Sequence, residues 1–204
     1  MPKLKLTYFD FPGGRGEDCR IALHIANADF EDDRLDGKNW PDRKAHTPFG
    51  ALPVLEVEGK GQLAQANAIL RYVGQAHNLH PTDSWEAARH ESIMGAVDDL
   101  RAKANNSGQS KDDDEKRQAR EEFASGYLHG WGGNVEAFIG EGPFVAGEKL
   151  NVVDLKLFVV VRWLVNGGLD YVPATVFEAF SKLMRQFAAV RDHEKVAEWS
   201  RRFE

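Results

Sequence analysis

The chain has 204 residues, of which 42% are hydrophobic and 28% charged, a composition that supplies a buried core and argues against wholesale disorder. The formal net charge is -6, from 26 basic and 32 acidic residues, whereas nucleic-acid binders usually carry a basic excess. We therefore expect no nucleic-acid partner.

Targeting signals and disulfides are not indicated either. The single cysteine, Cys19, cannot form an intrachain disulfide, which fits a reducing compartment. The first residues lack the apolar core of a signal peptide. The most apolar run, residues 152–165, is shorter than the roughly 20 residues that a membrane helix needs. We expect a cytoplasmic protein without a membrane partner.

The first part of the chain alternates between strand and helix patterns. Residues 3–9 alternate apolar and polar side chains, which predicts a half-buried strand, and glycines follow at positions 13, 14 and 16. A helix is expected over 17–28, a strand over 29–35, and an irregular loop from Asp36-Gly37. Two more strands, 53–58 and 62–65, flank the turn Gly59-Lys60-Gly61, and a helix follows over 66–77. The order β-α-β, loop, β-β-α indicates a thioredoxin-like α/β domain.

The second part of the chain is expected to be helical throughout. Apolar residues from Trp85 to Ala104 fall on one stripe of a long helix, and further helices are expected over 121–139, 152–165 and 177–190. Residues 105–116 are polar and are expected to form an exposed link. With a boundary near residues 80–83, we expect a thioredoxin-like domain at 1–80 and an all-α domain at 83–204.

Two short segments could hold a ligand through the backbone. Pro53 stands at the start of a strand. A cis Leu52–Pro53 bond would expose the backbone of Leu52 to an extended peptide. A trans proline at a strand start is an equally good interpretation. Gln65 and Ala66 mark a strand-to-helix junction whose free N–H groups favour an anion, or simply an ordinary junction.

Short motifs follow one another in an order that points to a family. They are Tyr8-Phe9, Arg15-Gly16-Glu17, Trp40 with Lys44, Pro48-Phe49-Gly50-Ala51-Leu52-Pro53 and Gln65-Ala66-Asn67-Ala68-Ile69, followed in the second part by Val97-Asp98-Asp99 and Asn151-Val152-Val153-Asp154. Together they resemble sigma-class cytosolic glutathione transferases over nearly the whole chain. The resemblance implies a homodimer with the two-domain glutathione transferase fold.

The resemblance also implies a detoxification enzyme that uses glutathione as co-substrate and no metal. Glutathione would attack an apolar electrophile, with isomerase or peroxidase side activity also possible for such a site. A free thiol has a pKa of about 8.5, so a hydrogen bond from the Tyr8 hydroxyl would favour the thiolate. Arg15 would add positive potential near the sulfur, and Phe9 would contact the electrophile. The remaining glutathione contacts would come from Trp40, Lys44, Leu52, Pro53, Gln65, Ala66, and Asp98 or Asp99 of the other subunit.

Three features depart from the family pattern. The segment 10–14 is one residue longer, which bears on the placement of Arg15, while Ala51 and Ala66 stand where glutamine and serine are usual. Losing two neutral hydrogen bonds would weaken glutathione binding by about 1–3 kcal/mol. These alanines are also compatible with a second interpretation, in which the chain is a non-catalytic protein of the same fold that binds glutathione or apolar ligands. A third interpretation is an interaction domain of transferase-like fold.

Other chemistry is less well supported by the residue patterns. Gly13-Gly14-Arg15-Gly16 lacks the Gly-Lys-Ser/Thr of a phosphate loop, and Cys19 has no Cys-x-x-Cys partner. His77 and His80 lack an evident third metal ligand, so a frayed helix end is the better interpretation.

Overall fold

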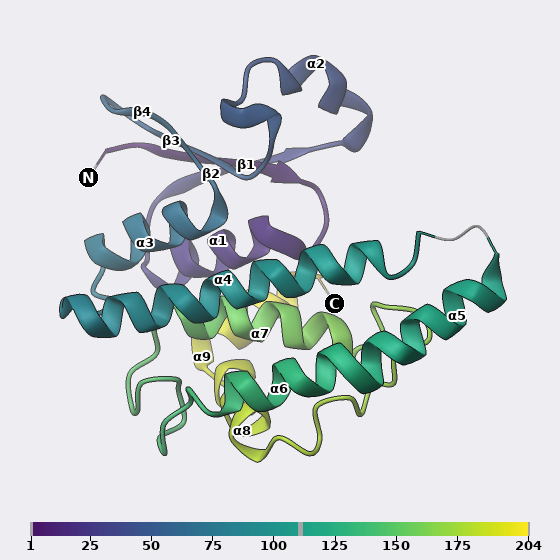
Figure 1. Ribbon diagram of the computed structural model, residues 1–204. Coiled ribbons are helices and arrows are strands. Elements are labelled where there is room, and N and C mark those ends of the chain that lie inside the picture. Colours follow the sequence, from purple (N-terminus) through teal and green to yellow (C-terminus); the bar gives the residue numbers. More distant parts are fainter. Residues whose placement is uncertain (1, 110–111, 204) are drawn as a thin grey trace. The chain divides into compact units, whose positions relative to one another are not determined.

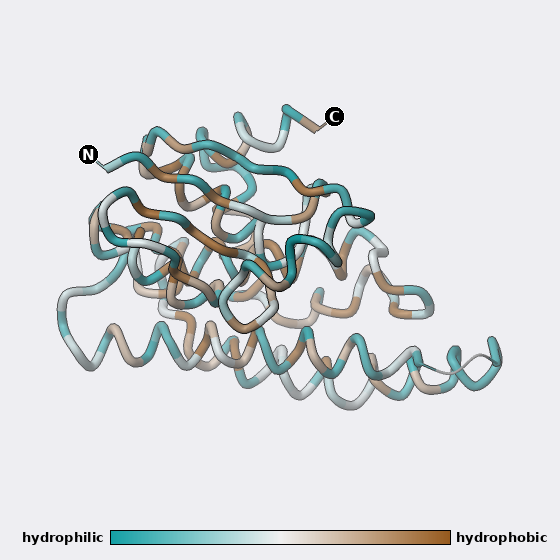
Figure 2. Tube along the Cα trace, turned by 90° about the horizontal axis from the view of Figure 1, so that it is seen from above, coloured by the Kyte–Doolittle hydropathy of each residue, from teal (hydrophilic) through white to brown (hydrophobic). Residues whose placement is uncertain are grey.

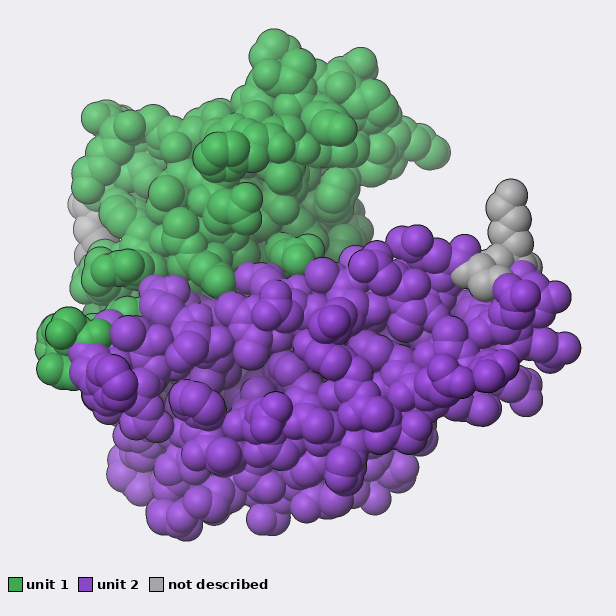
Figure 3. All heavy atoms as spheres, viewed as in Figure 1, with its two compact units in different colours: residues 1–84, 193–204 green, residues 85–192 purple. Residues whose placement is uncertain are grey.

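The computed structural model describes residues 2–109 and 112–203, which fold into two compact units. Unit 1 contains the described residues up to Ser84 and those from His193 onward, and unit 2 contains Trp85–Asp192 (Figure 3). The functional roles expected for 1–80 and 83–204 stay predictions.

Unit 1 is built on a four-stranded mixed sheet. The strands are β1 (Leu4–Phe9), β2 (Phe30–Leu35), β3 (Val54–Val57) and β4 (Gly61–Ala64), in the order β2-β1-β3-β4. β1 is parallel to β2, to which a helix connects it, and antiparallel to β3, while β3 and β4 form an antiparallel hairpin. The expected thioredoxin-like order is confirmed.

Two helices cover one face of this sheet (Figure 1). α1 (Gly14–Ile25) and α3 (Ala66–Ala76) pack together on one face, where Leu6, Ile21 and Ile69 are fully buried. The apolar stretches of the strands, brown in Figure 2, supply the sheet's side of this core. The predicted alternation along 3–9 therefore corresponds to real burial, because successive side chains of a strand point to opposite faces.

The long connection between β2 and β3 contains a short helix that the sequence patterns did not predict. It holds a 3-10 turn (Gly37–Asn39), α2 (Trp40–Lys44) and a second 3-10 turn (Pro48–Gly50). The Asp36 carboxylate accepts a hydrogen bond from the Lys38 N–H at the first turn. At five residues, α2 is too short for a helical hydrophobic period to be detectable.

The chain returns to unit 1 at its C-terminal part. α9 (Glu194–Ser200) packs against α1 and is followed by a 3-10 turn (Arg201–Phe203). Val196 and Trp199 are buried, and the Lys195 ammonium donates a hydrogen bond to the Ile25 carbonyl, at 3.0 Å. This helix was not predicted, because only two of its residues are buried.

The described part of unit 2 is helical, as expected, apart from an isolated β-bridge between Phe144 and Gly147. Its helices are α4 (Ser84–Asn106), α5 (Asp113–Glu122), a π-helical turn (Phe123–Leu128), α6 (His129–Glu136), α7 (Val152–Val165) and α8 (Ser181–Arg191). α7 is buried along most of its length, which explains why residues 152–165 are so apolar. Within the described part of the chain, none of the helices is both long and apolar enough to cross a membrane.

Several predicted boundaries are wrong, including those of the helix expected over 121–139, since the continuous helical segment runs from Asp113 to Glu136. Residues 105–116 are not one link, because α4 continues to Asn106 and α5 begins at Asp113. The Asp112 carboxylate caps α5 by accepting hydrogen bonds from the backbone of Asp114 and Glu115, so its charged residues stabilise a helix start. The link falls partly on residues 110–111, which lie outside the described residues. The helix expected over 177–190 begins only at Ser181, and the one expected over 17–28 begins at Gly14.

Candidate active site

Tyr8 lies where β1 meets the first turn of α1. It is 8% exposed, and its ring is 5.5 Å from the ring of Phe9 and 5.6 Å from that of Phe11. A Cβ on Gly16 would sit 2.0 Å from the Tyr8 ring, and one on Gly14 would sit 2.7 Å from the Tyr8 hydroxyl oxygen. The phenol therefore lies directly against the backbone of the helix start, where N–H groups and the helix dipole favour negative charge.

The glycines that the sequence analysis noted only as chain breaks have this packing role. Gly14 has φ +68, a conformation that other residues adopt at a cost, and Gly16 leaves room for the aromatic ring. Arg15 lies between them in the first turn of α1 and is partly buried. The one-residue-longer segment 10–14 therefore still delivers Arg15 to the turn that touches Tyr8.

A cavity of about 490 Å³ lies at the carboxyl ends of β1 and β2. Its lining combines aromatic and aliphatic side chains with two exposed carboxylates: Phe9, Asp10, Phe11, Leu35, Asp36 and Gly37. Two rings from this lining contact Tyr8, so an apolar molecule bound here would lie close to the phenol. Phe9 was predicted for this role, whereas Phe11 was missed because it stands in a loop without periodicity.

The loop after β2 carries the next group of predicted residues. The Trp40 ring lies 5.7 Å from the ring of Phe9, at 75°, so the start of α2 is fixed beside the cavity. The Lys44 side chain is exposed, and its stem passes close to Gly50. Its ammonium is thus available to an anionic group.

An ion pair holds α2 to the sheet. The Arg43 guanidinium is 2.8 Å from the Asp33 carboxylate, which also accepts a hydrogen bond from the Thr7 hydroxyl at 2.9 Å. Burial alone would raise the pKa of Asp33, but these hydrogen bonds and the charges of Lys5 and Arg43 outweigh it and lower the pKa. Asp33 is therefore a charged anchor for the loop.

The backbone features expected at the two short segments are present. The Leu52–Pro53 peptide bond is cis, which resolves the two interpretations left open by the sequence. Gln65 is exposed with φ 71, and buried Ala66 begins α3. The Gln65 side chain and the first N–H groups of α3 thus stand at one strand-to-helix junction.

The two candidate aspartates of α4, in unit 2, differ in their surroundings. The Asp98 carboxylate is 2.9 Å from the ammonium of Lys156, which is fully buried on α7. Asp99 is exposed on the same helix. The buried ammonium needs a counter-charge, so Asp98 has a structural role that Asp99 does not share.

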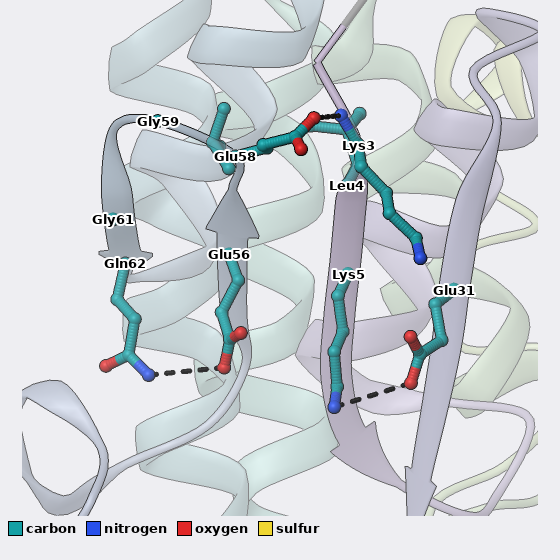
Figure 4. A pocket seen from close by; sticks show the side chains of 10 residues that line it. Lys3, Leu4, Lys5, Glu31, Glu56, Glu58, Gly59, Gly61 and Gln62 are labelled. Atoms are coloured by element: carbon teal, nitrogen blue, oxygen red, sulfur yellow. Dashed lines mark hydrogen bonds and ion pairs between the residues drawn. The ribbon is translucent and has the colours of Figure 1, made fainter.

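A second cavity, of about 420 Å³, lies at the opposite end of the sheet (Figure 4). Its polar side chains form cross-strand pairs: the Lys5 ammonium is 3.4 Å from the Glu31 carboxylate, and the Gln62 amide donates to Glu56 at 3.3 Å. Since these pairs satisfy one another in an open surface, the arrangement is typical of a solvated sheet face. Among the described residues, no group of three or more His, Cys, Asp or Glu side chains could hold a metal.

Comparisons with known proteins agree with this architecture. Residues 4–75 match the family model "Glutathione S-transferase, N-terminal domain", and residues 98–202 match "Glutathione S-transferase, C-terminal domain". Glutathione S-transferase 1 of Ascaris suum is 46% identical over 102 residues, which are 50% of this chain and 48% of that protein. Probable glutathione S-transferase 9 of Caenorhabditis elegans is 29% identical over 200 residues, covering 96% and 90% of the two chains.

A solved structure extends the similarity to the whole fold. The glutathione S-transferase from Ascaris lumbricoides superposes with a TM-score of 0.85 at 30% identity, covering 100% of this chain and 98% of that one.

Proposed function

Because the chain belongs to the glutathione S-transferase family, we propose that it is a sigma-like enzyme whose Tyr8 activates the glutathione thiol for attack on apolar electrophiles. The observation that carries the proposal is that the Tyr8 phenol lies against the first turn of α1 and that its ring contacts Phe9 and Phe11, two residues that line the cavity. A thiolate here would receive a hydrogen bond from the hydroxyl while its electrophile occupied the apolar cavity.

The energetics of this step are within reach of one hydrogen bond. Lowering the thiol pKa by two units requires about 2.7 kcal/mol of differential stabilisation. A hydrogen bond to a charged group contributes about 1.5–3 kcal/mol, and the N-terminus of α1 adds a smaller favourable term. The attacking sulfur forms a bond to the electrophile's carbon, and the leaving group departs with the bonding electron pair.

The remaining residues would hold the tripeptide in an extended form. Lys44 and Trp40 would bind the glycyl carboxylate end, and the backbone of Leu52 before Pro53 would pair with the cysteinyl unit. Gln65 and the helix start at Ala66 would bind the γ-glutamyl end, whose carboxylate suits the backbone N–H groups at the start of α3.

An aspartate of the other subunit would complete the site in a homodimer. We assign this role to Asp99, since the carboxylate of Asp98 is paired with Lys156. Arg15 would contribute positive potential from the turn that touches Tyr8. A cytoplasmic location and a role in detoxification belong to the same proposal.

The test is conjugation of glutathione to a chloronitrobenzene across pH, for the wild type and Tyr8→Phe. We expect Tyr8→Phe to lose about 10- to 100-fold in kcat/KM at neutral pH, with the apparent thiol pKa rising toward about 8.5. Tyr72→Phe is a matched control, because that ring lies against the Lys60 ammonium at a different place on unit 1.

Each outcome separates the competing interpretations. Equal rates for the wild type and Tyr8→Phe would remove Tyr8 from the mechanism and direct attention to Arg15. Glutathione binding without turnover in either protein would favour the non-catalytic binding protein.

A further inference from the structure

Arg20 is a buried guanidinium next to the Tyr8 phenol, and the site described above gives it no role. Its side chain is 0% exposed, and its guanidinium carbon lies 5.6 Å from the centre of the Tyr8 ring. A charge removed from water is retained only where partners compensate for the lost hydration. The partners of Arg20 therefore indicate what the charge does.

Two of its hydrogen bonds go to the turn that follows β1. Nη2 donates to the Phe9 carbonyl at 3.1 Å, and Nη1 donates to the Phe11 carbonyl at 3.3 Å, while Nε donates to the Asp32 carboxylate at 2.8 Å. A planar guanidinium can hold several acceptors in one fixed geometry, which an ammonium cannot. Arg20 thus fixes the turn that places the Phe11 ring against Tyr8.

Glu17 is the second acidic neighbour of this guanidinium, and Trp199 holds one of its oxygens. The Trp199 indole N–H donates to Glu17 Oε1 at 2.9 Å, whereas Glu17 Oε2 lies 3.9 Å from Arg20 Nη1. Both Glu17 and Trp199 are buried, at 0% and 3% exposure. The tryptophan therefore fixes one Glu17 oxygen, and the other stays at ion-pair distance from Arg20 but beyond hydrogen-bond distance.

Other charges near this cluster have partners of their own. On β2, Arg34 pairs with Asp32 at 2.8 Å and with Asp10 of the turn at 3.0 Å. On α9, Glu198 lies 3.5 Å from His24, and Lys195 donates to the Ile25 carbonyl. Arg15 and the buried Asp18 also lie on α1, so the approach of Glu17 and Asp32 to Arg20 sets one part of the charge balance beside Tyr8.

We propose that Arg20 is a positioning residue for Tyr8, and that Trp199 keeps its charge and its hydrogen bonds available by holding Glu17 away from it. The proposal rests on the proposed function of Tyr8. Without the indole N–H, Glu17 closes onto Arg20, takes the donor now given to Phe11 and neutralises positive potential beside the phenol. Both effects disfavour a thiolate at the Tyr8 hydroxyl.

The experiment compares Trp199→Phe with Trp131→Phe in the whole 204-residue chain. Trp131 is a matched control, because its buried indole N–H also donates to the protein, to the Ala96 carbonyl at 3.0 Å, but within unit 2. The readouts are the ultraviolet absorbance of the bound glutathione thiolate as a function of pH and the pH profile of kcat/KM for a chloronitrobenzene.

We expect Trp199→Phe to raise the apparent pKa of the bound thiol and to lower kcat/KM about 3- to 10-fold near pH 6.5, with recovery at alkaline pH. Trp131→Phe should keep the wild-type profile. Arg20→Lys is a second variant: it retains a positive charge but cannot hold both carbonyls, so it should also raise the thiol pKa.

The proposal is overturned if folded Trp199→Phe binds glutathione with the wild-type thiol pKa, or if Trp131→Phe shifts that pKa equally. If Arg20→Lys does not fold, the comparison of Trp199→Phe with Trp131→Phe still tests the proposal. A wild-type protein that binds glutathione without lowering its thiol pKa would instead refute the proposed function of Tyr8, which is a distinguishable result.

Discussion

At the scale of single residues, the contact between Gly16 and Tyr8 decides where the phenol lies. A Cβ added to Gly16 would come within 2.0–2.6 Å of three atoms of the Tyr8 side chain, and this side chain is buried. Gly16→Ala must therefore move either the ring or the start of α1. We expect a loss of about 1–3 kcal/mol in unfolding free energy together with a loss of conjugation activity.

The matched control for that substitution is Gly95→Ala. Gly95 lies inside α4, and a Cβ built there meets nothing within 4 Å, so alanine should stabilise the helix by about 0.5–1 kcal/mol. Urea denaturation of both variants measures the difference. Equal stability changes would show that Tyr8 does not depend on Gly16 for its position.

Ala66 supports a second prediction at this scale. It begins α3 next to Gln65, where serine would add a hydroxyl for the γ-glutamyl carboxylate. One additional hydrogen bond of about 0.5–1.5 kcal/mol should tighten the calorimetric dissociation constant for glutathione by about 2- to 10-fold in Ala66→Ser. A change of less than twofold would count against the missing hydroxyl as a cause of weak binding.

At the scale of elements, the start of α7 is fixed by a capping box that Asn151 and Asp154 form. The Asp154 carboxylate accepts hydrogen bonds from the backbone N–H groups of Val145 and Asn151, at 2.8 and 2.9 Å, and from the Gln186 amide at 3.2 Å. Burial nonetheless raises its pKa from 3.8 to about 6, because desolvation outweighs these hydrogen bonds.

This raised pKa makes stability depend on pH in a defined direction. Protonated Asp154 stabilises the fold fully below its unfolded pKa of 3.8, and that contribution is lost as pH rises through about 6. Asparagine does not titrate, but it would direct an amide N–H₂ toward a backbone donor. The loss of unfolding free energy caused by Asp154→Asn should therefore be smaller near pH 8 than near pH 4.5, by about 2 kcal/mol. Urea denaturation of the wild type and the variant at these pH values measures this difference. A loss of unfolding free energy that grows toward pH 8 would contradict the prediction.

At the scale of the whole molecule, the two neighbouring aspartates of α4 are expected to have different roles, Asp98 in stability and Asp99 in glutathione binding. Asp98→Asn removes a carboxylate from the buried ammonium of Lys156, so we expect a loss of about 2 kcal/mol or more in stability. Asp99→Asn should leave stability nearly unchanged and weaken glutathione binding. Denaturation and calorimetry on both variants measure the two effects.

Mixed dimers would show whether Asp99 acts across the subunit interface. If it does, a dimer of one Tyr8→Phe chain and one Asp99→Asn chain contains one site with both defects and one with neither. Its activity should then exceed that of either variant alone. Activity no higher than the average of the two parent variants would place Asp99 in the site of its own chain.

Much of the fold followed from the sequence because it depends on local periodicity and burial. The alternation over 3–9 and the helical spacing over 66–77 each match an observed element, and the ordered motifs identified the family and enzyme class, glutathione transferase, which the family models confirm. Two of the elements that were missed, α2 and α9, are short and carry few buried residues, and most of α5 was mistaken for an exposed link because its residues are highly charged. A helix of so few residues does not show a detectable helical period in its hydrophobic residues.

The sequence by itself determined the architecture, the family and the position of Tyr8 at a strand end. Only the tertiary structure showed that Arg20 holds the turn beside Tyr8, that Phe11 lines its cavity, and that Asp98 pairs with Lys156. Trp199 and Glu17, 182 positions apart, meet in a hydrogen bond that no local pattern encodes. The physical reason is that hydrophobic periodicity is a property of neighbouring residues, whereas the partner of a buried charge or donor is chosen by packing between distant segments.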